Sequence, residues 1–104
     1  MRTLFQTIRQ QFLEGNDLVL VSIIASSGST PRGAGSHMLI GQDGRVAGTI
    51  GGGSVEYRAG LMALDILKKK ESCEHEYKLN HEDVENIGMV CGGDVTVFFQ
   101  YLDH

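Results

Sequence analysis

The 104-residue sequence has no tryptophan, one proline and only two cysteines, and its 13 acidic residues outnumber its 9 basic ones. Two cysteines without a CxxC spacing exclude a disulfide scaffold, so we expect reduced thiols in a reducing compartment. The net charge of −4 argues against nucleic acid or an anionic membrane as a partner. The longest apolar run, Leu18 to Ala25, is too short to span a bilayer, and no signal-type segment precedes it. We therefore expect a cytoplasmic protein.

The hydrophobic pattern predicts an α+β fold in a single domain that spans residues 1–104. Apolar residues at helical spacing predict helices over residues 3–14 and 55–70. Strands are predicted over residues 18–25, 37–41, 45–50, 73–79 and 94–102. The first strand is apolar on both parities and is expected at the centre of the sheet, while Asp43-Gly44 predicts a hairpin between the next two. We expect a mixed β-sheet with this hairpin and with helices packed on it.

Glycine is concentrated in one part of the chain, since nine of the fourteen glycines lie between Gly28 and Gly53. Such a density is favoured where the backbone takes a special conformation or lets another group approach closely. The first glycine segment, residues 28–35 (GSTPRGAG), follows the expected central strand, where open α/β sheets tend to bind ligands. Its Arg32 is a candidate anion clamp, although a plain bent loop explains the glycines and Pro31 equally well.

The second segment, residues 48–56 (GTIGGGSVE), leads from a strand into a helix through Gly51, Gly52 and Gly53. A helix N-terminus exposes unpaired amides, and glycines let a phosphate or carboxylate approach them. The spacing matches neither a Walker loop nor GxGxxG, so it does not indicate a nucleotide. The alternative is that Gly53 or Ser54 simply caps the helix, with Glu56 favoured in its first turn.

The third segment, residues 88–94 (GMVCGGD), places Cys91 directly before Gly92 and Gly93. These glycines open the backbone around the sulfur, and nearby amides or Arg32 would favour the thiolate. Cys91 is therefore a candidate nucleophile, persulfide carrier or metal ligand, with a buried structural thiol as the alternative. Cys73 shares the apolar parity of its strand and is predicted to lie in the core. The four histidines have no metal-ligand spacing and are expected to be structural or on the surface.

Taken in order, GSTPRGAGSHM, GTIGGGSVE and GMVCGGDV resemble the XdhC/CoxI family, accessory proteins of molybdenum hydroxylases such as xanthine dehydrogenase. The resemblance covers nearly the whole chain and corresponds to the N-terminal domain of the family, without the Rossmann-like C-terminal domain that usually follows. It implies a non-catalytic, homodimeric chaperone that binds the molybdenum cofactor (molybdopterin). Such a chaperone protects the cofactor while a cysteine desulfurase installs the terminal sulfur ligand, and then delivers it to the hydroxylase.

The family segments supply the candidate cofactor-binding residues, which are Ser29, Thr30, Arg32, Gly51, Gly52, Gly53, Ser54, Glu56, Cys91, Gly92 and Gly93. The terminal phosphate of the cofactor suits Arg32 and the glycine amides, and its metal or sulfur suits a thiolate at Cys91, the candidate metal ligand. Family members often have a cysteine where this chain has Ser54, so Cys91 would act alone.

Two other functions fit the same segments. One is an adaptor that docks to the hydroxylase or the desulfurase without binding cofactor. The other is a small thiol-dependent enzyme with Cys91 as nucleophile toward a phosphate-bearing substrate, for which the sequence offers no general base.

Overall fold

The computed structural model describes residues 3–26, 35–51, 53–79 and 93–104 of the chain. Its elements in chain order are α1 (Leu4–Leu13), β1 (Leu18–Ser26), β2 (His37–Gly41), β3 (Gly44–Gly48), α2 (Gly53–Lys69), β4 (Cys73–Leu79) and β5 (Gly93–Leu102). Every element begins and ends within about two residues of a segment predicted from hydrophobic periodicity, which confirms the α+β class. Within these ranges, neither helix is long and apolar enough to cross a membrane.

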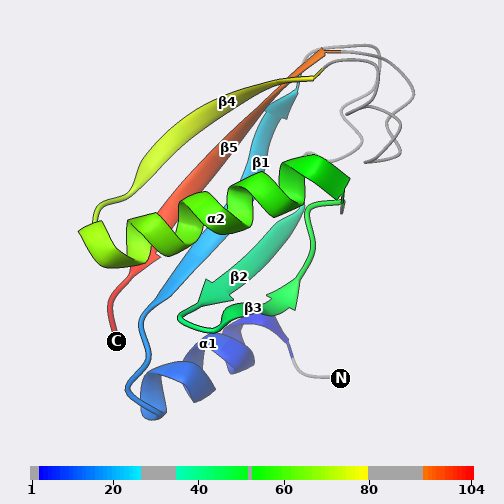
Figure 1. Ribbon diagram of the computed structural model, residues 1–104. Coiled ribbons are helices and arrows are strands. Elements are labelled where there is room, and N and C mark those ends of the chain that lie inside the picture. The colour runs from blue at the N-terminus through cyan, green and yellow to red at the C-terminus, as the bar shows by residue number, and fades with distance from the viewer. Residues whose placement is uncertain (1–2, 27–34, 52, 80–92) are drawn as a thin grey trace.

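The strands form one open sheet in the order β3-β2-β1-β5-β4, with β1 at the centre as predicted (Figure 1). The sequence suggested a mixed sheet, but all four pairings are antiparallel. The reason lies in the course of the chain. After β3, α2 carries the chain back to the end of the sheet at which β3 began, so β3 and β4 run in the same direction. These two strands lie at opposite edges of the sheet and do not pair.

α1 begins with a capping box at Thr3. The Thr3 hydroxyl accepts a hydrogen bond from the Gln6 N–H at 3.1 Å, and the Gln6 side chain accepts one from the Thr3 N–H at 2.8 Å. The helix lies next to β3 (Figure 1), and its Phe5 and Leu13 side chains are exposed. α1 therefore contributes little to the main core.

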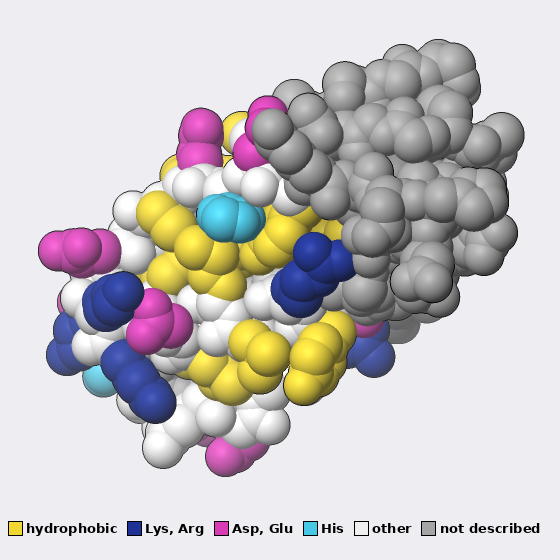
Figure 2. Space-filling view, turned by 45° about the horizontal axis from the view of Figure 1, so that its top comes forward, with side chains coloured by type: hydrophobic (Ala, Val, Ile, Leu, Met, Phe, Trp, Pro, Cys, Tyr) yellow, Lys and Arg dark blue, Asp and Glu magenta, His cyan; other side chains and the backbone are white. Residues whose placement is uncertain are grey.

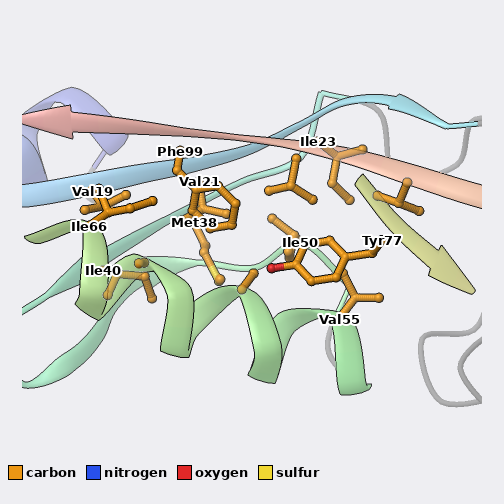
Figure 3. Close-up of a cluster of buried hydrophobic side chains, with 14 residues drawn as sticks. Val19, Val21, Ile23, Met38, Ile40, Ile50, Val55, Ile66, Tyr77 and Phe99 are labelled. Atoms are coloured by element: carbon orange, nitrogen blue, oxygen red, sulfur yellow. The ribbon is translucent and has the colours of Figure 1, made fainter. Parts of the chain in front are cut away.

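The main core lies between α2 and one face of the sheet (Figures 1 and 3). Strand side chains point toward the helix, among them Val21 of β1, Met38 of β2 and Phe99 of β5, each at most 1% exposed. Burying each such side chain stabilises the fold by about 1.5–3 kcal/mol. Ala59 and Ala63 of α2 are fully buried, and their small side chains let the helix approach the sheet closely. This contact fixes the position of both ends of α2.

Cys73 packs against the edge of this core and is half-buried, as the parity of its strand predicted. It lies at the start of β4.

Asp17 ties the start of β1 to the end of β5. Its carboxylate accepts hydrogen bonds from the Tyr101 hydroxyl at 2.5 Å and from the His104 N–H at 3.1 Å, and His104 Nδ1 lies 2.5 Å from it. The Tyr101 bond, followed by the two from His104, holds the pKa of Asp17 well below its usual range. The same bond raises the pKa of Tyr101 to about 12. The clasp is therefore complete only where Asp17 is ionised and Tyr101 is protonated.

This clasp makes stability depend on pH at both extremes. A folded-state pKa of Asp17 below the unfolded value of about 3.9 stabilises the fold above that pH, and this contribution is lost as the pH falls further. A folded-state pKa of Tyr101 near 12 lies above the unfolded value of about 10, so its contribution is present below pH 10 and lost as the pH rises toward 12. We expect Asp17→Asn to destabilise the protein most between about pH 4 and 10. Urea midpoints across the pH range measure this difference.

Asp65→Asn is the matched control, because the Asp65 carboxylate makes an exposed ion pair with Lys69 at 2.9 Å on the surface of α2. Its effect on stability should be small throughout. A loss in Asp17→Asn that is the same at pH 3, 7 and 11 would contradict the assigned clasp.

Candidate functional site

The three glycine segments connect elements that meet at one end of the sheet, which we call the loop end. Here β1, β3 and β4 finish, and β2, α2 and β5 begin (Figure 1). The strand register shows the proximity directly, because Ser26 pairs with Val95 and Leu79 pairs with Gly93. The described residues that flank the three segments therefore lie close together, as a shared binding site requires.

A polar contact joins β1 to β2 near this end. The Ser22 hydroxyl lies 2.8 Å from His37 Nδ1, and Ser22 is almost completely buried. This hydrogen bond agrees with the structural role expected for a histidine outside any metal-ligand spacing.

The structure describes part of the candidate site. It places Gly51 before α2, Gly53, Ser54 and Glu56 in the first turn of α2, and Gly93 at the start of β5. The other candidates lie outside the described residues, namely Ser29, Thr30, Arg32, Gly52, Cys91 and Gly92. The meeting of Arg32, the glycine amides and the Cys91 thiolate in one hollow stays a prediction.

Residues 48–51 form the entry turn, which leads from β3 into α2. Gly48 has a φ of +74°, and a Cβ atom there would lie 2.4 Å from the carbonyl oxygen of His37, so only glycine fits. Gly51 has a φ of +119°, and its N–H donates to the Thr49 hydroxyl at 3.1 Å. This amide, one of those considered as anion donors from the sequence, is therefore hydrogen-bonded within the turn.

Glu56 holds the entry turn from within α2. Its Oε1 accepts hydrogen bonds from the Thr49 hydroxyl and from the Ile50 N–H, the latter at 3.0 Å. An acidic side chain that reaches back from the first turn to an earlier N–H acts as in a capping box. Arg45 Nη1 lies 3.5 Å from Glu56 Oε2 and also donates to the Gly48 carbonyl at 3.0 Å. The carboxylate and the guanidinium thus fix the turn together.

Ile50 anchors the same turn in the core. It is 5% exposed and lies near Val55 and Tyr77 in the hydrophobic cluster (Figure 3). Burial raises the pKa of the Tyr77 hydroxyl, which stays protonated at neutral pH and donates to the Met62 sulfur at 3.6 Å. Apolar and polar contacts therefore hold the entry turn in one conformation.

Among the described residues, one group of side chains has the spacing to hold a metal ion: Asp17, Asp103 and His104. This group lies where β1 begins and β5 ends, which is the end of the sheet opposite the loop end (Figure 1). Hydrogen bonds to Tyr101 and His104 already engage both oxygens of the Asp17 carboxylate. The group is therefore the structural clasp and separate from the candidate site.

The sequence indicates Glu56 as an acidic first-turn residue but does not indicate Thr49 or Arg45. The capping pattern was the available signal, because a hydroxyl residue precedes the glycine run and an acid follows it. Arg45 had no local signal, since its contact depends on how the hairpin packs beside α2.

The sequence profile of the XdhC and CoxI family matches residues 12–78. The chain belongs to the XdhC and CoxI family. The match confirms the resemblance carried by the glycine segments, and it includes the first two of them.

Two curated proteins of Escherichia coli (strain K12) are similar to this member of the XdhC and CoxI family. The molybdenum cofactor insertion chaperone PaoD is 29% identical over 101 residues, which cover 97% of this chain and 31% of PaoD. The uncharacterized protein YqeB is 34% identical over 79 residues, or 76% of this chain and 14% of YqeB.

Part of a crystal structure described as a xanthine dehydrogenase from Bacillus halodurans has the same fold. It superposes with a TM-score of 0.69 and 26% identity over 93% of this chain and 30% of that one. The chain thus spans about a third or less of the length of each of these relatives.

Gly48→Ala should destabilise the protein by at least about 2 kcal/mol, because a left-handed φ is combined with a clash against backbone. Gly15→Ala is the matched control: its φ is +82°, but nothing lies within 4 Å of the added Cβ. It should cost about 1 kcal/mol. Urea denaturation measures both, and equal losses would show that the approach to His37 does not restrict residue 48.

Glu56→Ala should lower the free energy of unfolding by about 1–3 kcal/mol, because the Ile50 N–H loses a charged acceptor. Glu56→Gln keeps an acceptor and should lose less than half as much. The amide of Ile50 should exchange hydrogen faster in the alanine variant, as measured by NMR. Unchanged exchange at Ile50 would contradict the role given to the carboxylate.

Proposed function

We propose that this chain binds the molybdenum cofactor and delivers it to a hydroxylase of the xanthine dehydrogenase type. The observation that carries this proposal is that the described residues flanking all three family segments meet at the loop end. Membership of the family and the chaperone name of PaoD give the ligand class. The cofactor is cargo in this role, so the chain needs binding groups rather than a catalytic acid or base.

The residue chemistry at the loop end fits such cargo. The entry turn is held rigidly by Glu56, Arg45 and Ile50, and a preformed turn loses little entropy when it binds. Arg32 and amides at the start of α2 would bind the phosphate, and the Cys91 thiolate would contact the metal or its sulfur ligand. One charge-assisted hydrogen bond contributes about 1.5–3 kcal/mol, so several converging donors are needed for tight binding.

The proposal extends to the partners. A cysteine desulfurase would install the terminal sulfur while the cofactor is bound, and the chain would act as a homodimer. Both features come from the family resemblance.

Cofactor retention tests the proposal. We expect freshly purified protein to carry a pterin and molybdenum through gel filtration, measured by fluorescence of the oxidised pterin and by elemental analysis. Arg32→Ala and Cys91→Ser should each lower retention at least about tenfold, the loss expected for one charged contact. Cys73→Ser is the matched control and should leave retention unchanged, because Cys73 starts β4 at the opposite end of the sheet.

Other outcomes identify the alternative functions. Protein that never retains cofactor, yet forms a stable complex with the cofactor-free hydroxylase, would be an adaptor. Equal retention by Cys91→Ser would remove the thiolate from the site.

A further inference from the structure

A hollow of about 340 Å³ opens next to the entry turn, between α2 and the β2–β3 hairpin. We call it the α2 groove. Met38 and Ile40 of β2 line it, with Tyr57, Leu61 and Leu64 on the helix side. Hydrophobic side chains interrupt the charged surface of the molecule (Figure 2), and those most exposed on α2 are Tyr57 at 70% and Leu61 at 53%. The groove is thus an apolar hollow beside the entry turn, with the exposed Tyr57 and Leu61 on its α2 side and the almost fully buried Met38 and Ile40 as its floor.

Two glycines are among the residues that line this groove. Gly60 lies in the middle of α2, where glycine destabilises a helix relative to alanine, and its φ is not in the left-handed region. Nothing lies within 4 Å of the position that its Cβ would occupy, so close packing does not require glycine either. A larger side chain at this position would therefore project into the open space that Gly60 lines. Gly44 also has nothing within 4 Å of its Cβ position, but its φ of +116° is itself a reason for glycine in the hairpin.

One end of the groove is polar. Arg45 and Glu56 line it there, and the Arg45 side chain is 53% exposed. Arg45 Nη1 bonds to Gly48, while a guanidinium carries five N–H donors in all. Small-molecule sites combine this range of volume with apolar walls and a few polar groups that orient the ligand. An exposed tyrosine ring and an arginine at the end suit a flat heteroaromatic ring that bears acceptor atoms.

We propose that the α2 groove binds the pterin ring of the cofactor, with Tyr57 against the ring face and Arg45 donating to a ring oxygen or nitrogen. This inference rests on the proposed function and adds to it a ring subsite outside the three glycine segments. The groove and the entry turn share Arg45 and Glu56. A ligand whose ring occupies the groove therefore lies beside the turn that leads into α2.

Filling the groove tests the proposal. Gly60→Leu places a side chain in the open space and favours the helix, so the fold should be kept. Asp65→Leu is the matched control, because Asp65 is an exposed residue of the same helix outside the groove. Free pterin, without phosphate or metal, is the probe, and its affinity is measured by ligand-observed NMR because fragments bind weakly. We expect saturable binding to the parent protein and to Asp65→Leu, and at least fivefold weaker binding to Gly60→Leu.

Equal pterin binding by folded Gly60→Leu would overturn the proposal. So would a parent protein that retains the intact cofactor but does not bind pterin, and in that case the proposed function stands without the ring subsite. A parent protein that binds neither would overturn both. If circular dichroism shows that Gly60→Leu is not folded, Tyr57→Ala is used as the test variant instead. It should bind pterin at least threefold more weakly than the parent protein. If folded Gly60→Leu binds pterin as well as the parent protein but no longer forms a complex with the hydroxylase, the groove is a protein-docking surface instead.

Discussion

The close contact between α2 and the sheet is the interaction on which the rest of this structure depends. Two fully buried alanines, Ala59 and Ala63, allow the helix axis to approach β1, β2 and β5. Because the helix is held along its length, its first turn has a fixed position over the loop end of the sheet. Ile50 can then enter the core and Glu56 can reach the entry turn. A helix displaced by bulkier residues would move each of these contacts.

Glu56 has a structural role at the start of α2, beside the proposed cofactor site. A carboxylate in the first turn stabilises the helix through its exposed amides, but its charge would repel an anionic ligand. Arg45 offsets this charge from the neighbouring hairpin at 3.5 Å. The pair therefore keeps the turn in shape while limiting the negative potential beside the site. The same two residues border the α2 groove, so the shape of the turn and that of the groove depend on one contact.

The differences between prediction and structure occur where local patterns stop being informative. The hairpin strand was expected to reach Ile50 but ends at Gly48, because a left-handed φ breaks the ladder and turns Ile50 toward α2. The helix begins at Gly53 rather than Val55, since glycines carry no hydrophobic signal although they can start a helix. The mixed sheet was expected from the variety of elements. Only the placement of β3 and β4 at opposite edges makes every pairing antiparallel.

The sequence by itself determined the helices and strands, the central position of β1 and the family, because periodicity and motif order are properties of neighbouring residues. It also offered Gly51 and Glu56 as candidate site residues, and the structure shows both hydrogen-bonded within the entry turn. Only the tertiary structure decided that the flanks of all three segments share one end of the sheet. It alone decided that Arg45 meets Glu56 and that Gly60 lines a groove. These depend on distances between elements far apart in the chain, which are set by strand pairing and by the packing of α2 and not by any local pattern.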